Sequence, residues 1–168
     1  MLEMDAEAIY RELLAKVRAG VGEKTICLVG VHTGGAWVAE RLRTDLGLST
    51  PLGLLDVSFY RDDFARSGLK RDVRPSSIGF EVAGSHIVVV DDVLYTGRTV
   101  RAAMNELFDY GRPARIELAA LVDRGGRELP IAPNYVGRHV DVAPHMNIEL
   151  LRDDAGALQL KINPRGQE

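Results

Sequence analysis

Ile87-Val-Val-Val-Asp-Asp-Val-Leu-Tyr-Thr-Gly-Arg-Thr99 is the stretch that decides the fold of this chain. Its apolar beginning is typical of a strand that is buried on both faces of a parallel sheet. Asp91 and Asp92 follow, and we expect them to point into solvent or onto a ligand, because an unpaired buried charge is costly. Thr96, Gly97 and Thr99 then supply hydroxyl groups, close backbone approach and a helix N-terminus. The stretch therefore predicts a sugar-phosphate site at the end of this strand.

A purely structural interpretation makes the same stretch a core strand followed by an ordinary strand-to-helix loop. Thr and Gly are common in such loops, so the loop alone does not decide between the two interpretations. Asp91 and Asp92 favour a ligand site, because two adjacent like charges cost energy unless a metal, a cation or ribose hydroxyls offset them.

The rest of the chain alternates predicted strands and helices. Apolar runs predict strands at residues 25–31, 54–60, 87–93 and 116–122, followed by a terminal hairpin at residues 148–151 and 157–162. Asp5 is the expected N-cap of a helix over residues 6–19 that stops at Gly20, and a second helix runs from after Gly35 to Gly47. A third follows the phosphate loop, with a predicted core-facing stripe of Val100, Ala103, Met104, Leu107 and Phe108.

This alternation predicts an α/β fold, with a mainly parallel twisted sheet flanked by helices. Pro130 and Pro133 instead indicate a loop-rich cap between residues 123 and 140. In open parallel sheets, ligands bind beyond the carboxyl ends of the strands. We therefore expect three loops on one edge, at residues 32–35, 91–99 and 123–126.

Length and composition indicate one catalytic domain over residues 1–168. The chain is 46% hydrophobic and carries a net charge of −3, which argues against a protein devoted to nucleic acid. Its single cysteine, Cys27, lies in an apolar run, so we expect a buried strand residue rather than a nucleophile, and no disulfide within the chain. Acidic residues near the N-terminus and the absence of a membrane-length apolar run predict a cytoplasmic location.

Residues 88–100 resemble the phosphoribosyl pyrophosphate (PRPP) motif of type I phosphoribosyltransferases. The sequence Asp-Asp-Val-Leu-Tyr-Thr-Gly-Arg-Thr within it resembles the form of this motif in the family of pyrimidine operon regulators and uracil phosphoribosyltransferases. Residues 55–63 and 121–130 are similar to that family too. The resemblance covers residues 5 to about 140. It implies the type I phosphoribosyltransferase fold, with a flexible flap at about residues 61–79 and a small hood at about residues 123–168. It also implies a homodimer or higher homo-oligomer that converts uracil and PRPP to UMP and pyrophosphate with Mg²⁺.

The resemblance also implies roles for the residues around PRPP. Asp91 and Asp92 would contact the ribose hydroxyls, with Mg²⁺ nearby on PRPP oxygens, and Arg61 would join them as a catalytic residue delivered by the flap with Tyr60. The 5′-phosphate would lie against Val93, Leu94, Tyr95, Thr96, Gly97, Arg98 and Thr99. Arg98 faces either the phosphate or solvent.

Residues 32–35 resemble the pyrophosphate loop of the family. Thr33, Gly34 and Gly35 would bind the leaving group there, while the resemblance gives His32 no role. Many relatives carry a positive residue where this chain has Gly34, so pyrophosphate must rely more on N–H groups, on metal or on a mobile arginine.

Base binding is implied for Asp123, Arg124, Val140 and the backbone near residues 135–140. Main-chain groups alone can match the polar atoms of uracil, so the accepted base leaves no side-chain signature. Asp123 or Arg124 could equally form a structural ion pair. A purine or xanthine acceptor remains an alternative to uracil.

A second function is a regulator that senses UMP and binds leader RNA of a pyrimidine operon. By resemblance, Arg127 and Arg138 are the RNA-binding candidates. Gly126 and Ala132 stand where RNA-binding relatives carry basic or hydrogen-bonding side chains, which weakens this interpretation.

Overall fold

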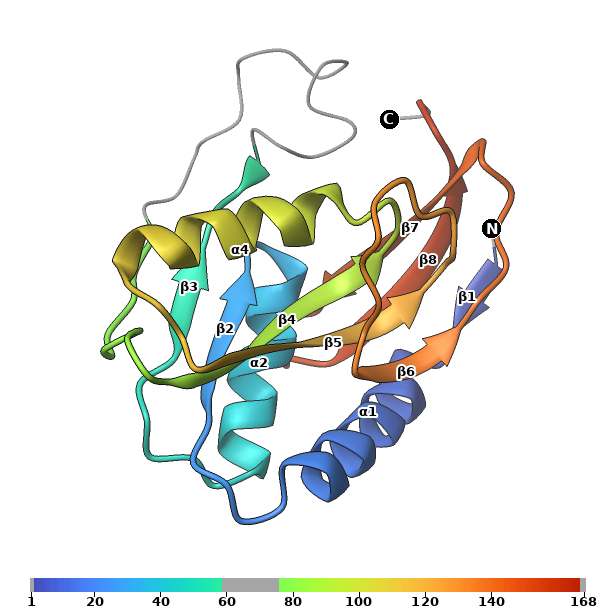
Figure 1. The fold of residues 1–168 in the computed structure, drawn as a ribbon. Coiled ribbons are helices and arrows are strands. Elements are labelled where there is room, and N and C mark those ends of the chain that lie inside the picture. Colours follow the sequence, from blue (N-terminus) through green and yellow to red (C-terminus); the bar gives the residue numbers. More distant parts are fainter. Residues whose placement is uncertain (1, 59–75, 167–168) are drawn as a thin grey trace.

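Two sheets organise the described part of the chain in the computed structural model, which covers residues 2–58 and 76–166 (Figure 1). The larger sheet has the strand order β3-β2-β4-β5-β6, and every neighbouring pair in it is parallel. Its strands are β2 (Cys27–Val31), β3 (Gly53–Leu55), β4 (His86–Leu94), β5 (Arg115–Asp123) and β6 (Tyr135–His139). The predicted α/β fold with a mainly parallel sheet is confirmed.

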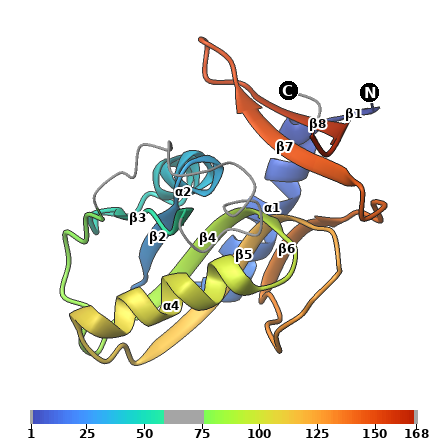
Figure 2. The same ribbon diagram turned by 90° about the horizontal axis from the view of Figure 1, so that it is seen from above.

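Helices cover both faces of this sheet, as Figure 2 shows from above. The helices are α1 (Ala6–Val21), α2 (Gly34–Asp45) and α4 (Arg98–Tyr110). Alternate residues of β4 serve opposite faces: Val88 and Val90 pack with α1 and α2, whereas Ile87 and Val89 pack with α4. Burial on both faces explains why this strand is a continuous apolar run rather than an alternating one. Among the described residues, no helix combines the length and the apolar character needed to cross a membrane.

The parallel arrangement brings the carboxyl ends of three strands together. Val29 of β2 pairs with Val89 of β4, and Leu94 of β4 pairs with Asp123 at the end of β5. The loops after Val31, Leu94 and Asp123 therefore leave the sheet at the same edge, as predicted.

A smaller antiparallel sheet joins the two ends of the chain. It has the order β1-β8-β7, with strands β1 (Leu2–Met4), β7 (Met146–Arg152) and β8 (Leu158–Pro164). The predicted terminal hairpin is confirmed as β7 and β8, while β1 was not predicted. The hood predicted for residues 123–168 thus contains this hairpin together with β6, a strand of the larger sheet.

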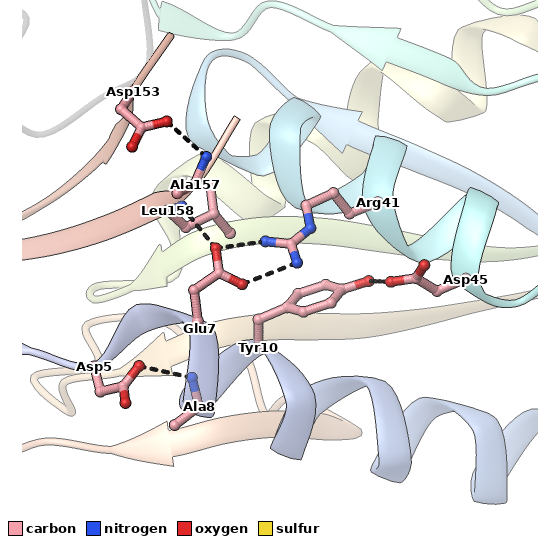
Figure 3. Close-up of polar contacts among 9 residues, drawn as sticks. All are labelled: Asp5, Glu7, Ala8, Tyr10, Arg41, Asp45, Asp153, Ala157 and Leu158. Atoms are coloured by element: carbon pink, nitrogen blue, oxygen red, sulfur yellow. Dashed lines mark hydrogen bonds and ion pairs between the residues drawn. The ribbon is translucent and has the colours of Figure 1, made fainter. Parts of the chain in front are cut away.

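A network of polar contacts fixes the smaller sheet to α1 and α2 (Figure 3). The Glu7 carboxylate accepts two hydrogen bonds of 2.9 Å from the Arg41 guanidinium and one of 2.8 Å from the Leu158 N–H. The Arg41 guanidinium lies over the Tyr10 ring at 4.1 Å, and the Tyr10 hydroxyl donates to Asp45 at 2.6 Å. One carboxylate in the first turn of α1 therefore connects three elements.

Several predicted element boundaries differ from the structure. Asp5 caps α1 as predicted, its carboxylate accepting the Ala8 N–H, but the helix continues past Gly20 to Val21. Strand β3 is shorter than predicted and ends at Leu55, and most of the predicted flap lies outside the described residues. Cys27 is buried in β2, as expected.

Strand β6 is the largest correction, because the sequence predicted a loop-rich cap there. Its five residues follow two prolines and include Gly137, which lies so close to β5 that a Cβ atom would stand 2.4 Å from the Leu121 carbonyl oxygen. Helix α4 also differs from prediction at Phe108, whose side chain is 56% exposed instead of core-facing.

Candidate functional site

The acid pair lies inside strand β4 rather than after it. Asp91 pairs with Ala120 of β5, and the strand continues to Leu94 because its parallel partner continues to Asp123. Asp91 is only 3% exposed, and its carboxylate accepts the Asp92 N–H at 2.9 Å, so of the two expected environments, solvent or a ligand, solvent is excluded and a ligand stays a prediction. Asp92 is half-buried, and its Oδ1 accepts the Val93 N–H at 2.8 Å. The two acids therefore differ in exposure.

Gly34 lies directly against the Asp92 carboxylate. A Cβ atom on Gly34 would stand 2.2 Å from Asp92 Oδ2 and 2.8 Å from its Cγ. A Cβ on Gly35 would lie 2.5 Å from the Val90 carbonyl oxygen. The two glycines thus allow the first turn of α2 to pack on β4, and they bring the predicted pyrophosphate loop into contact with the acid pair.

The predicted phosphate loop ends at the N-terminus of α4. Gly97 is the N-cap of that helix, with a φ of 94°, and the first turn contains no acidic residue. Thr96 is buried, and its hydroxyl accepts the Arg98 N–H at 3.2 Å. Backbone N–H groups and the helix dipole at such an N-terminus favour a bound phosphate.

Arg98 extends away from this loop towards solvent. Its side chain is 49% exposed, and its Nε lies 3.4 Å from the Glu128 carboxylate. A contact of Arg98 with phosphate therefore stays a prediction.

Residues 126–131, here called the support segment, contact the phosphate loop through hydrogen bonds and packing. The Thr96 carbonyl accepts hydrogen bonds from the N–H groups of Glu128 and Leu129, at 2.9 and 3.2 Å. Arg127 donates to the Tyr95 carbonyl at 2.7 Å, and Ile131 packs against Gly97. The backbone of the phosphate loop is therefore fixed by a segment about thirty residues further along the chain.

Arg127 is the centre of the support segment, although the resemblance suggested that it contacts RNA. Besides Tyr95, its guanidinium donates to Asp123 Oδ2 at 2.6 Å and to the Ile131 carbonyl at 2.9 Å. Three internal acceptors occupy this side chain, which is only 22% exposed. No sequence pattern predicts this supporting contact, since charge alone does not show where an arginine points.

The Tyr95 ring is enclosed by residues from three different segments. The Arg124 guanidinium lies over it at 4.1 Å and the Arg165 guanidinium at 5.0 Å. A Cβ atom on Gly126 would stand 2.5 Å from Tyr95 Cε2, and Gly126 has a φ of 76°. Close packing against Tyr95 and this backbone conformation explain why residue 126 carries no basic side chain here.

Asp123 and Arg124, two of the predicted base-binding residues, are buried at the end of β5. Asp123 pairs with Arg127 and accepts the Gly125 N–H at 2.9 Å; it does not pair with Arg124. Burial acts to raise the pKa of Asp123, but the hydrogen bonds from Arg127 and Gly125 outweigh it and hold the pKa below its ordinary value. The Asp123 carbonyl accepts the Val140 N–H at 2.9 Å, which places Val140 beside this strand end.

Arg124 is directed at the loop before β7. Its guanidinium donates to the carbonyl groups of Met146 and Ala143, at 3.0 and 3.2 Å. Burial lowers the pKa of Arg124. The structural ion pair considered for Asp123 or Arg124 is thus present for Asp123, with Arg127, whereas Arg124 is bound to carbonyl groups.

The remaining candidates are one arginine on β6, one threonine of the pyrophosphate loop, and two residues outside the described part of the chain. Arg138 is exposed on β6 and forms an ion pair with Glu12 of α1. Thr33 is the N-cap of α2, and its hydroxyl makes no cap hydrogen bond. Tyr60 and Arg61 lie outside the described residues.

The carboxylates of Asp91 and Asp92 have the oxygen-donor chemistry that Mg²⁺ prefers. No group of three or more acidic, His or Cys side chains that could hold a metal ion occurs in residues 4–58 and 76–166. The donor set therefore fits a Mg²⁺ ion that arrives with substrate oxygens rather than one held by protein ligands alone.

The chain was compared with protein families and with known proteins. Residues 2–147 match the family model of the phosphoribosyl transferase domain. The bifunctional protein PyrR of Nitrosococcus oceani is 50% identical over 158 residues, which is 91% of this chain and 89% of that protein. The bifunctional protein PyrR of Pseudomonas aeruginosa is 50% identical over 160 residues, 94% of each chain.

Solved structures support the fold. A hypoxanthine-guanine phosphoribosyltransferase from Bacillus anthracis superposes with a TM-score of 0.65 at 17% identity, over 86% of this chain and 84% of that one. The purine phosphoribosyltransferase from Pyrococcus horikoshii gives a TM-score of 0.63 at 25% identity, over 82% and 85% of the two chains. The family model matches most of the chain, and the PyrR relatives share half of its residues over nine-tenths of its length. The chain therefore belongs to the phosphoribosyl transferase family and, within it, to the bifunctional PyrR proteins.

Proposed function

We propose that this protein transfers the phosphoribosyl group of PRPP to uracil, forming UMP and pyrophosphate. The observation that carries the proposal is the contact between Gly34 and Asp92. Through it the loop after β2 and the acid-bearing end of β4 meet, so that one donor molecule can reach both. The relatives named bifunctional protein PyrR support the same conclusion.

Each part of the site has a chemical task in this reaction. The carboxylates of Asp91 and Asp92 can accept hydrogen bonds from ribose hydroxyls and favour the positive charge that grows at the anomeric carbon. The N–H groups of residues 95–99 and the Thr96 and Thr99 hydroxyls can hold the 5′-phosphate. The N–H groups around Thr33, Gly34 and Gly35 can hold pyrophosphate. Mg²⁺ would neutralise charge on the departing pyrophosphate oxygens.

Main-chain groups are the proposed readers of the base. The Asp123 side chain is occupied by Arg127, and Arg124 is occupied by two carbonyl groups and the Tyr95 ring. We therefore assign uracil to the backbone near residues 123–124 and 135–140, with Val140 against the base.

A base panel tests the proposal. The chain with PRPP and Mg²⁺ should form a nucleoside monophosphate from uracil and much less from hypoxanthine, guanine or xanthine. Removing Mg²⁺ with EDTA should abolish turnover, and added Mg²⁺ should restore it. A folded protein that converts no uracil, or that prefers a purine, would contradict the proposal.

A second function, control of a leader RNA, is favoured by the bifunctional naming of the relatives. Of the two predicted RNA-binding arginines, Arg138 is exposed, whereas Arg127 is held inside by three acceptors. We propose that any RNA contact uses Arg138 and that the protein acts as a homodimer. Arg138→Ala should weaken binding to a pyrimidine-leader RNA, and UMP should strengthen it; RNA affinity indifferent to both would exclude this function.

A further inference from the structure

The terminal hairpin, β7 and β8, contacts the element that carries the pyrophosphate loop. Arg152 at the end of β7 lies over the Trp37 ring at 4.8 Å and pairs with Glu40 at 3.3 Å. Trp37 and Glu40 both belong to α2, the helix that begins with Gly34. At the start of β8, Leu158 donates its N–H to Glu7. The turn end of the hairpin is thus fixed to α1 and α2.

The other end of the hairpin contacts the phosphate loop. Arg165 follows β8, and its N–H donates to the His145 carbonyl at 2.8 Å. This bond keeps the chain after β8 beside the loop before β7. From there the Arg165 guanidinium reaches the face of the Tyr95 ring at 5.0 Å.

Tyr95 is held by different residues at its backbone and at its ring. Arg127 fixes the backbone carbonyl, whereas Arg124 and Arg165 contact the ring. Arg124 is buried, and Arg165 is exposed. A planar guanidinium stacks well on an aromatic face, where the ring quadrupole attracts its charge. Arg165 can therefore restrict the Tyr95 ring without itself being part of the core.

We propose that Arg165 is a positioning residue for PRPP binding: acting through Tyr95, it holds residues 95–99 in the conformation that receives the 5′-phosphate. The proposal rests on the proposed function, because it takes PRPP as the donor. A loop that is already ordered loses less conformational entropy when the ligand binds, so its affinity is higher. A residue that merely completes β8 would instead affect stability without affecting PRPP.

The test measures the Kd of PRPP with Mg²⁺, and the KM of uracil, for variants at position 165. Arg165→Ala should weaken PRPP binding about two- to fivefold, the size expected for one exposed cation–π contact, with little change in the KM of uracil. Arg165→Lys keeps the positive charge but not the planar guanidinium, and should lose less affinity for PRPP than Arg165→Ala does. Arg165→Met keeps an apolar stem of similar length without the charge and should behave like Arg165→Ala.

Two further variants locate the effect. Arg112→Ala removes another exposed arginine, from the loop between α4 and β5, and should leave PRPP binding unchanged. In a Tyr95→Leu background, Arg165→Ala should have no additional effect, because the ring through which Arg165 acts is gone.

The outcomes separate this proposal from the function on which it depends. If the unsubstituted chain binds no PRPP, the proposed function fails and Arg165 has no donor to position. If it binds PRPP and Arg165→Ala binds equally well, or if Arg165→Met restores the affinity, the inference alone is overturned.

Discussion

Gly34 is the position at the site where a side chain is most tightly excluded. A Cβ atom on residue 34 would lie only 2.2 Å from Asp92 Oδ2, so glycine at this position leaves room for the carboxylate. A longer side chain in this loop would therefore have to displace the carboxylate. The absence of a positive residue at position 34 is thus tied to the placement of Asp92 in this chain.

Gly34→Ala should reduce kcat/KM for PRPP about tenfold or more, because a displacement of about 1 Å at reacting groups is costly. Steady-state kinetics with varied PRPP measures this effect. Gly156→Ala is the control: Gly156 has a φ of 87° and open space around it, so alanine there costs about 1 kcal/mol of backbone strain far from the acids. Equal kinetics for Gly34→Ala and the unsubstituted chain would show that Asp92 adjusts freely.

Arg127→Met should weaken PRPP binding in the absence of any RNA. The substitution removes the donors to the Tyr95 and Ile131 carbonyls and leaves the buried Asp123 carboxylate without its guanidinium. We expect a loss of about 2–4 kcal/mol in the free energy of unfolding, together with a higher Kd for PRPP. Urea unfolding and PRPP titration measure the two effects. Unchanged PRPP affinity, with weaker RNA binding, would return Arg127 to the RNA-binding interpretation.

At the scale of elements, Glu7 is the residue on which the packing of α1, α2 and β8 depends most directly. Its carboxylate accepts from Arg41 twice and from Leu158 once, as Figure 3 shows. Glu7→Gln should lower the free energy of unfolding by about 1–2 kcal/mol at pH 7, since the charge-assisted bonds are lost. Urea unfolding checks this value, with the exposed Glu23→Gln as control. Equal losses in the two variants would mean that the network contributes nothing specific.

The elements also show where sequence reasoning succeeded and where it stopped. The run from Ile87 to Val90 predicted a buried central strand, because a strand covered on both faces must be apolar throughout. Strand β6 escaped prediction because its pairing with β5 depends on tertiary contact, and Gly137 has no side chain to mark it. Phe108 shares the helical spacing of the core stripe, yet α4 turns this residue outward.

For the candidate site, the sequence predicts which loops meet at the sheet edge but not which side chains contact one another there. Parallel strands force their carboxyl ends to one edge, so the meeting of the loops follows from topology. The contacts of Tyr95 with Arg124 and Arg165 join residues that are far apart in the chain, and no local pattern encodes them.

At the scale of the whole molecule, three buried or half-buried carboxylates tie stability to pH. Hydrogen bonding to Arg41 is the main reason that the pKa of Glu7 lies below its ordinary value. For Glu117, burial acts to raise the pKa, but the hydrogen bonds with His86 and Tyr135 outweigh burial, so the pKa lies below its ordinary value. The pKa of Asp123 is also below its ordinary value, because the hydrogen bond from Arg127 helps to outweigh burial.

A lowered pKa in the folded state means that the carboxylate stabilises the fold at pH values above its ordinary pKa, and that this stabilisation is lost as pH falls through the folded-state value. The free energy of unfolding in urea should therefore be constant near neutrality and fall below about pH 4.5, the ordinary value for glutamate. The double variant Glu7→Gln and Glu117→Gln should start lower and fall less steeply. A slope equal to that of the unsubstituted chain would show that other groups cause the acid sensitivity.

The pairing of β1 with β8 also bears on how the protein is made. Leu2 pairs with Ile162 and Met4 with Leu160, so the smaller sheet joins residues that lie far apart along the chain. Contacts between such distant parts of a chain close a very large loop and form slowly. During translation, the main sheet can gather its strands in order, while β1 must wait for β8 to leave the ribosome. Arg165 follows β8, so the Tyr95 ring acquires its second guanidinium only after β8 has been synthesised.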